Sequence, residues 1–200
     1  MRHTRKMATL RRSNQLLRSF RFEQTRPEIF YGGLAEDTAA LVDNLGRDLG
    51  VQLFGARVLD VGGGPGYFAD AFSRRGARYV GLEPDAGEMS AAGIHLSNSV
   101  RGDGTNLPFA DNSFDVVYSS NVAEHIPNPW DMGEEMLRVT RPGGLTILSY
   151  TVWLGPHWAQ STGALQLAFP RYHPSWAWWL TRVPGVREFA VSNLTLVLQK

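Results

Sequence analysis

Hydrophobic and polar residues follow two different rhythms along this chain. Over residues 7–20 and again over 34–49, apolar side chains recur every three or four positions, which predicts two amphipathic helices. Gly50 is placed to end the second of them. The segment 26–33 contains one proline and two glycines, so we expect it to break the helical pattern between them.

From residue 57 the pattern changes to short apolar runs separated by helical patterns. The runs predict strands at residues 57–61, 79–82, 99–101, 114–119, 145–152, 164–169 and 191–200. The patterns between them predict helices at residues 66–75, 86–96, 129–140 and 175–183. A turn at 142–144 is expected to lead into the fifth strand. This alternation favours one α/β domain with a parallel sheet and right-handed crossovers.

The amino-acid composition excludes several kinds of functional site. The chain has no cysteine, which excludes disulfides, cysteine metal sites and a cysteine nucleophile, and suits a reducing compartment. Its histidines show no metal-ligand spacing, so we expect no metal site. No apolar run reaches the length of a membrane-spanning helix. We therefore expect a cytoplasmic protein.

Charge is unevenly placed. Residues 1–26 hold eight Arg or Lys and one acid, whereas residues 27–200 hold twelve bases and eighteen acids. A basic segment suits nucleic acid, an anionic membrane or an acidic partner, and the alternative is a solvated, partly frayed terminal helix. We divide the chain into a basic N-terminal arm and helix, 1–33, and a domain, 34–200.

A glycine turn stands between the first strand and the helix that follows it. Four glycines and a proline occupy positions 62–66, after the buried run Val58–Val61. This strand, turn and helix are typical of a nucleotide-binding βα unit, because glycine lets the backbone approach a ligand closely. The G-x-G-x-x-A spacing, with Glu83 about twenty residues later, also fits a dinucleotide-binding unit. The turn alone therefore indicates an adenosine-type ligand and leaves its identity open.

Five spaced motifs within residues 55–152 separate these options. They are D-x-G-x-G-x-G at 60–66, the acidic end of the second strand at 80–85, G-D-x-x-x-L-P-F-x-x-x-S-F-D at 102–115, N-V-A-E-H-I at 121–126 and L-R-V-T-R-P-G-G at 137–144. In this order they resemble class I S-adenosylmethionine (SAM) dependent methyltransferases. The chain is similar to their small-molecule branch, which includes ubiquinone and menaquinone biosynthesis enzymes.

The resemblance implies a fold and a cofactor. The fold is a three-layer α/β sandwich with a Rossmann-like, mostly parallel sheet in the order 3-2-1-4-5-7-6 and an antiparallel last strand. The cofactor is SAM. The cofactor-binding residues that the resemblance implies are Asp60, Gly62, Gly63, Gly64, Gly66, Glu83, Pro84, Asp103, Gly104, Thr105 and Asn121.

Individual roles follow from the same resemblance. Asp60 is placed near the amino end of the cofactor, and Asn121 lines its methionine end. Glu83 accepts both ribose hydroxyls, since a carboxylate offers two strong acceptors. Asp103 accepts from the adenine amino group. The alternative to these cofactor contacts is that Glu83 is an ordinary surface acid at the end of a strand and Asp103 an ordinary turn aspartate.

Catalysis by such an enzyme is mainly placement of an acceptor against the methyl group. His125 is the candidate general base, which is needed only if the acceptor atom carries a proton. Its alternative role is to shape the pocket. Tyr31 either covers the cofactor or packs as an ordinary aromatic. We expect a small-molecule or lipid-like acceptor, and the acceptor atom and the oligomeric state stay open.

Two features depart from the family pattern. Only residues 154–162 separate the fifth strand from the next expected one, so a substrate lid is short, supplied from elsewhere or lost. A catalytically inactive SAM-binding or partner-binding protein is therefore the alternative. Three tryptophans within 173–182 suit a membrane-interface anchor, an apolar pocket or a packed helix, and they make peripheral membrane contact a hypothesis.

Two other functions are disfavoured. A nicotinamide-dependent oxidoreductase has no place for the motifs at 101–115 and 137–144. Methylation of nucleic acid is weakly supported, because Ser119 to Val122 stand where an Asn-Pro-Pro-Tyr or Asp-Pro-Pro-Tyr signature is expected.

Overall fold

The computed structural model describes residues 2–7, 9–22, 25–90, 98–151 and 193–200. Its helices in this part of the chain are α1 (Arg2–Arg5), α2 (Leu10–Ser19), α3 (Pro27–Leu49), α4 (Ala69–Ser73), α5 (Ala86–Ser90) and α6 (Pro129–Val139), with 3-10 turns η1 (Phe20–Phe22) and η2 (Ala123–His125). Its strands are β1 (Arg57–Val61), β2 (Arg78–Glu83), β3 (Ser99–Arg101), β4 (Phe114–Ser120), β5 (Thr140–Thr151) and β6 (Asn193–Gln199).

The described strands form one sheet in the order β3-β2-β1-β4-β5-β6. The pairs from β3 to β5 are parallel, and β6 runs antiparallel to β5. This confirms the expected Rossmann-like sheet with an antiparallel last strand. The strand expected at 164–169, the helix expected at 175–183 and the tryptophans within 173–182 lie outside the described residues.

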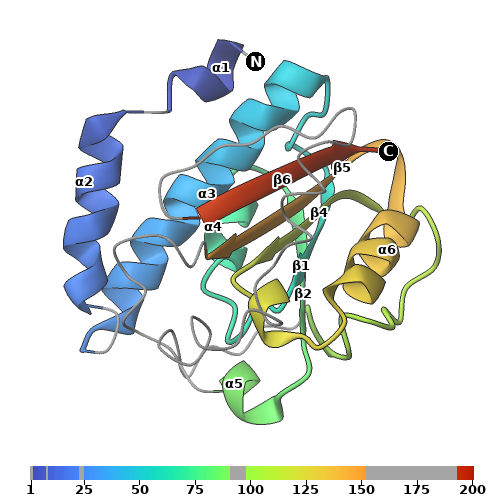
Figure 1. The fold of residues 1–200 in the computed structure, drawn as a ribbon. Helices are drawn as coiled ribbons and strands as arrows, with labels where there is room; N and C mark the ends of the chain where they lie inside the picture. The colour runs from blue at the N-terminus through green and yellow to red at the C-terminus, as the bar shows by residue number, and fades with distance from the viewer. Residues whose placement is uncertain (1, 8, 23–24, 91–97, 152–192) are drawn as a thin grey trace, which may run out of the picture.

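Helices cover both faces of the sheet, as the three-layer expectation requires (Figure 1). One core packs the sheet against α3 and α4 and includes Val58, Phe72 and Tyr118. The other packs it against α6 and includes Leu59 and Met132. Successive residues of β1 face opposite layers, so Val58 and Leu59 belong to different cores.

The expected break at 26–33 was wrong. A single helix, α3, begins at Pro27 and continues through Gly32 and Gly33 to Leu49. Proline is well suited to a first helical position, because the amide it lacks has no intrahelical partner there. Two interior glycines cost about 1 kcal/mol each, an amount that burial of the helix face can offset. Gly50 ends α3 as expected, with φ +79° and its N–H donated to Gly46.

Three element boundaries also differ from the predictions. The helix after the glycine turn starts at Ala69, and the amphipathic pattern at 7–20 gives α2, which begins at Leu10 and is preceded by a separate short helix, α1. The turn expected at 142–144 lies inside β5, where the pairing with β4 shifts register. A Cβ at Gly144 would lie 2.7 Å from the Asp115 carbonyl oxygen, so the two backbones approach too closely for a side chain. Beyond Ser90, the helix expected to reach 96 lies outside the described residues.

The N-terminal segment is packed on α3, on the side away from the sheet (Figure 1). Asp48, near the end of α3, accepts hydrogen bonds from His3 and Thr4. Asp37, in the middle of α3, pairs with Arg12 of α2. The expected boundary at residue 33 stays a prediction about domains, and the continuous helix α3 crosses it.

Candidate cofactor and acceptor site

The glycine turn lies at the carboxyl end of β1, where a parallel sheet places its ligands. Gly62, Gly64 and Gly66 have φ values of +79°, +52° and +94°, a region that favours glycine. The N–H groups of Gly62 and Gly63 donate to the Leu82 carbonyl at 2.8 and 3.1 Å, which ties the turn to β2. A Cβ at Gly64 would meet nothing within 4 Å, so the turn leaves open space at this point.

Glu83 is fixed beside that open space. Its Oε2 accepts the Gly64 N–H at 3.1 Å, and its Oε1 accepts the Asp85 N–H at 3.2 Å. Each oxygen keeps capacity for a further donor, because an ionised carboxylate has about four acceptor sites. The exposed Pro84 follows, and its carbonyl accepts the Arg101 Nε–H at 3.1 Å. The structure therefore presents a half-buried carboxylate with two oriented oxygens at the end of β2.

Asp60 lies beneath the turn and is 2% exposed. Burial raises the pKa of Asp60 to about 7, opposed by a hydrogen bond from Tyr79 and reinforced by the charge of Glu83. The Tyr79 hydroxyl donates to Asp60 Oδ2 at 2.7 Å. A Cβ on Gly63 would lie 3.0 Å from the Tyr79 hydroxyl and 3.3 Å from Asp60 Oδ2, so this pair forms the floor of the turn.

Sequence reasoning missed Tyr79. A usable signal was present, because a strand tyrosine that is buried needs a partner for its hydroxyl. In the parallel pair, Tyr79 lies opposite Val58, and Asp60 is two residues further along β1 on the same face. The register of β1 and β2 was the missing information.

Asp103 and its neighbours form a tight turn beyond β3. The Asp103 side chain is exposed, and its Oδ1 accepts the backbone N–H and the hydroxyl of Thr105 at 2.8 and 2.9 Å. Gly104 is buried, and a Cβ there would lie 3.1 Å from Val61 Cγ1 and 3.4 Å from Met132. The bonds within the turn use only Oδ1 of Asp103, so the turn presents its other carboxylate oxygen, Oδ2, for a ligand. Gly104 places the turn next to the end of β1.

The segment that follows this turn is held by α6. Arg138 donates to the backbone carbonyls of Leu107 and Phe109 at 3.0 and 2.8 Å. Glu135, which pairs with Arg138, accepts the Leu107 N–H at 2.7 Å. These contacts give the L-P-F part of the third motif a structural role, because they fix the loop that carries Asp103.

Asn121 has the left-handed backbone that the turn after β4 requires. Its φ is +55°, and its N–H donates to the Ser149 carbonyl at 2.8 Å. A non-glycine residue in this region marks a strained position that the surroundings must hold in place. A Cβ at Gly62 would lie 2.2 Å from Val122, so the turn after β4 closes directly onto the glycine turn.

His125 ends the 3-10 turn η2 and is exposed. Its backbone N–H donates to the Val122 carbonyl at 2.9 Å. The structure places it in the loop that follows β4, on the same edge of the sheet as the glycine turn. Its role as a base stays a prediction.

The start of α3 reaches the glycine turn. The ring of Tyr31 stacks on that of Tyr67, the residue after Gly66, with centroids 5.0 Å apart and planes 11° from parallel. Burial raises the pKa of Tyr67, reinforced by the charges of Glu28 and Glu88. Because these acids lie on α3 and α5, both helices border the turn. Tyr31 therefore packs against the turn, and whether it also covers a cofactor stays a prediction.

Metal-binding groups and membrane-spanning helices were searched for among the described residues. No group of His, Asp or Glu there is arranged to hold a metal ion. No helix in that part of the chain is both long and apolar enough to cross a membrane.

Comparisons with known proteins identify the family of the chain. Residues 59–148 match a family model described as a methyltransferase domain. Over 243 aligned positions, the chain is 53% identical to an uncharacterized methyltransferase of Mycolicibacterium gilvum, with 96% of the chain and 95% of the relative covered. Over 246 positions it is 51% identical to one of Mycobacteroides abscessus, with the same coverage.

A solved structure shares the fold. A Methanococcus maripaludis protein, provisionally described as an S-adenosyl-L-methionine-dependent methyltransferase, superposes with a TM-score of 0.57 at 16% identity, covering 94% of this chain and 93% of that one. An open glycine turn bordered by strand-end acids fits an adenosine-type cofactor. The methyltransferase relatives align with this chain over almost their whole length. The chain belongs to the methyltransferase family, as a class I SAM-dependent methyltransferase.

Proposed function

We propose that this enzyme methylates a small-molecule or lipid-like acceptor above the carboxyl ends of β1, β2 and β4. The observation that carries the proposal is the position of the Glu83 carboxylate. It accepts the N–H of Gly64, the residue at which the glycine turn faces open space. An acceptor bound at this edge also agrees with the general rule that parallel sheets bind ligands at the carboxyl ends of their strands. The cytoplasm, where the absence of cysteine is unremarkable, is the proposed location.

The proposed cofactor contacts follow the strand ends. The two Glu83 oxygens accept the ribose hydroxyls, and the Asp103 oxygen outside its turn accepts the adenine amino group. Gly64 admits the ligand against bare backbone, Gly62, Gly63 and Gly66 shape the turn that carries it, and Pro84, Gly104, Thr105 and Asn121 line its edges. Asp60 acts through the floor of the turn, where its charge favours the cationic end of the cofactor.

Bound SAM supplies a methyl group on a positively charged sulfur, which is a good leaving group. The protein aligns the acceptor with that methyl and keeps water out, so proximity supplies most of the rate. Where the acceptor atom carries a proton, His125 is the proposed base, and one of its ring nitrogens takes that proton. The exposure of His125 suits contact with a separate acceptor molecule.

A second candidate is SAM binding without turnover. The alignment with the Mycolicibacterium relative has 243 positions, whereas this chain has 200 residues, so the relative has internal residues with no counterpart here. Such a difference agrees with the short segment expected after β5. If the missing residues form the acceptor lid, the cofactor site persists and catalysis is lost.

Calorimetric titration with S-adenosylhomocysteine tests the site. Glu83→Gln removes one charged acceptor and is expected to weaken binding roughly 10- to 100-fold, as hydrogen bonds to charged groups contribute about 1.5–3 kcal/mol. Glu134→Gln, at an exposed position of α6, is the matched control and should bind as the wild type does.

The outcomes separate the candidates. Equal binding by wild type and Glu83→Gln would refute the proposed ribose contact. Binding that depends on Glu83, followed by SAM-dependent methylation in an acceptor screen, supports the enzyme. Binding that depends on Glu83, without turnover on any acceptor in a screen that includes lipids, favours the second candidate.

A further inference from the structure

The N-terminal segment is a fixed part of the folded domain. Asp48 accepts four hydrogen bonds at 2.7–2.9 Å, from the backbone and side chains of His3 and Thr4. Burial alone would raise the pKa of Asp48, but these bonds hold it far below the ordinary value. Arg12 of α2 reaches Asp37 with two guanidinium nitrogens. Asn44 donates to the Met7 sulfur at 3.2 Å, which completes the attachment.

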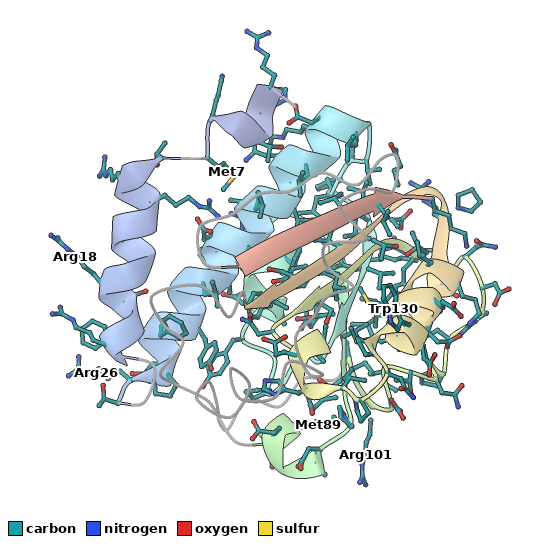
Figure 2. The ribbon with its side chains drawn as sticks, viewed as in Figure 1. Met7, Arg18, Arg26, Met89, Arg101 and Trp130 are labelled. Carbon is teal, nitrogen blue, oxygen red and sulfur yellow. The ribbon has the colours of Figure 1, made fainter. Side chains whose placement is uncertain are left out.

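Most bases of this segment point away from the domain. Their side chains form what we term the basic face, which consists of Arg2, Lys6, Arg11, Arg18, Arg21 and Arg26, all exposed. Within the described residues, no carboxylate pairs with any of these six. Figure 2 shows Arg18 and Arg26 projecting outward from the same side of the molecule. Because the helices that carry them are anchored to α3, the charges are held as a surface.

The basic face reaches the site. Its last member, Arg26, immediately precedes α3, and the first turns of α3 carry Tyr31, which stacks on Tyr67 beside the glycine turn. Ile29 lies between them in sequence and is 43% exposed, so an apolar side chain also faces outward here. A surface that contacts Arg21, Arg26 and Ile29 therefore lies beside the segment of α3 that packs on the glycine turn.

We propose that the basic face docks on an anionic lipid bilayer and that the enzyme takes a lipid-like acceptor from that surface. The proposal rests on the proposed methyl transfer and names its acceptor class. Charge complementarity supports it, because residues 1–26 carry a net charge of +7 and the remainder carries −6. An anionic surface attracts the first part and repels the second, which orients the molecule with the basic face towards the lipid.

A bilayer fits this face better than a nucleic acid does. Proteins that bind single strands combine basic residues with exposed aromatic rings on which bases stack. The aromatic rings along this side already have partners, because Arg21 lies over the Phe22 ring and the Tyr31 ring contacts those of Phe30 and Tyr67. The exposed aliphatic Ile29 instead suits shallow contact with lipid.

Co-sedimentation with vesicles tests the proposal. The probes are vesicles of phosphatidylcholine alone and of phosphatidylcholine mixed equally with phosphatidylglycerol. The wild type should pellet only with the anionic vesicles, and high salt should release it. Each basic residue beside an anionic surface contributes roughly fivefold to partitioning, so Arg18→Gln/Arg21→Gln should weaken binding roughly 25-fold.

The control has the same change in charge at the end of the sheet where β2 begins, away from Arg18 and Arg21. Arg78→Gln/Lys200→Gln alters two exposed bases, at the start of β2 and just after β6, and should bind vesicles as the wild type does. Equal weakening by both double variants, or no dependence on phosphatidylglycerol, would overturn the proposal. Tighter binding to a DNA or RNA oligonucleotide than to the anionic vesicles would assign the face to nucleic acid and overturn it too.

Titration of the same proteins with S-adenosylhomocysteine separates this proposal from the methyl transfer on which it rests. All three proteins should bind S-adenosylhomocysteine equally. Binding of that ligand without vesicle binding overturns the docking alone. Vesicle binding by a wild type that does not bind the ligand overturns the transfer, and with it the delivery of an acceptor.

Discussion

Replacing Asp60 by asparagine tests the physical account of the floor beneath the glycine turn. The wild-type carboxyl is 2% exposed and accepts a hydrogen bond from Tyr79. Burial disfavours the charged form more than this bond favours it, so the pKa of Asp60 is raised from 3.8 to about 7. Asparagine keeps the shape and an acceptor for the Tyr79 hydroxyl and carries no charge at any pH.

The sign and size of the effect follow from proton linkage. A raised pKa in the folded state means that the folded protein binds the proton more tightly than the unfolded chain. Stability is therefore lost as the pH rises from the unfolded pKa near 4 to the folded pKa near 7. Each pH unit in this window costs about 1.4 kcal/mol, so the wild type loses up to about 4 kcal/mol that Asp60→Asn retains.

Denaturant unfolding without cofactor, at several pH values from 4 to 8, measures the difference between the two proteins. Taking the difference cancels the titration of all other groups. The variant should match the wild type near pH 4, gain on it up to pH 7 and keep a constant advantage above. A difference that is flat across this range, or a variant less stable than the wild type above pH 7, would refute the account.

Two further variants probe the same turn. Tyr79→Phe removes the donor to Asp60 and keeps the ring that packs against Phe72, so unfolding at pH 8 should require about 1–2 kcal/mol less, with a smaller loss at pH 4; equal losses at both values would contradict a charge-dependent bond. Gly62→Ala should lower the melting temperature more than Gly55→Ala. Both glycines have left-handed φ, but only at Gly62 would the Cβ meet a neighbour, Val122 at 2.2 Å, and equal losses would contradict that contact.

The sequence predicted those parts of the fold that depend on local pattern. The strand and glycine turn at 57–66 were predicted correctly, because burial and left-handed backbone select residue types at neighbouring positions. Glu83 was correctly placed at the end of the second strand, because a strand end is recognisable from the apolar run before it. Its contact with the Gly64 N–H agrees with the expected juxtaposition of the two strand ends.

The parts that the sequence missed depend on distant contacts. The continuity of α3 through Gly32 and Gly33 depends on packing against the N-terminal segment and the sheet, which local propensity does not encode. Nothing in the local pattern distinguishes Asp37 and Asp48 from other helix acids, because their partners lie 25 to 45 residues away. The pairing of Tyr79 with Asp60 required the register between two strands, and neither residue alone indicates it.

The two acids at the ends of β1 and β2 serve different physical purposes because their surroundings differ. Glu83 is half-buried and receives N–H groups from both sides, so its carboxylate is already oriented for neutral donors such as hydroxyls. Asp60 is buried with one hydroxyl donor, and its charge is costly until a positive group comes near. A cationic ligand above Gly63 would relieve that cost, whereas a neutral one would not. The cost of burying Asp60 therefore favours a positively charged ligand over a neutral one, and SAM carries such a charge.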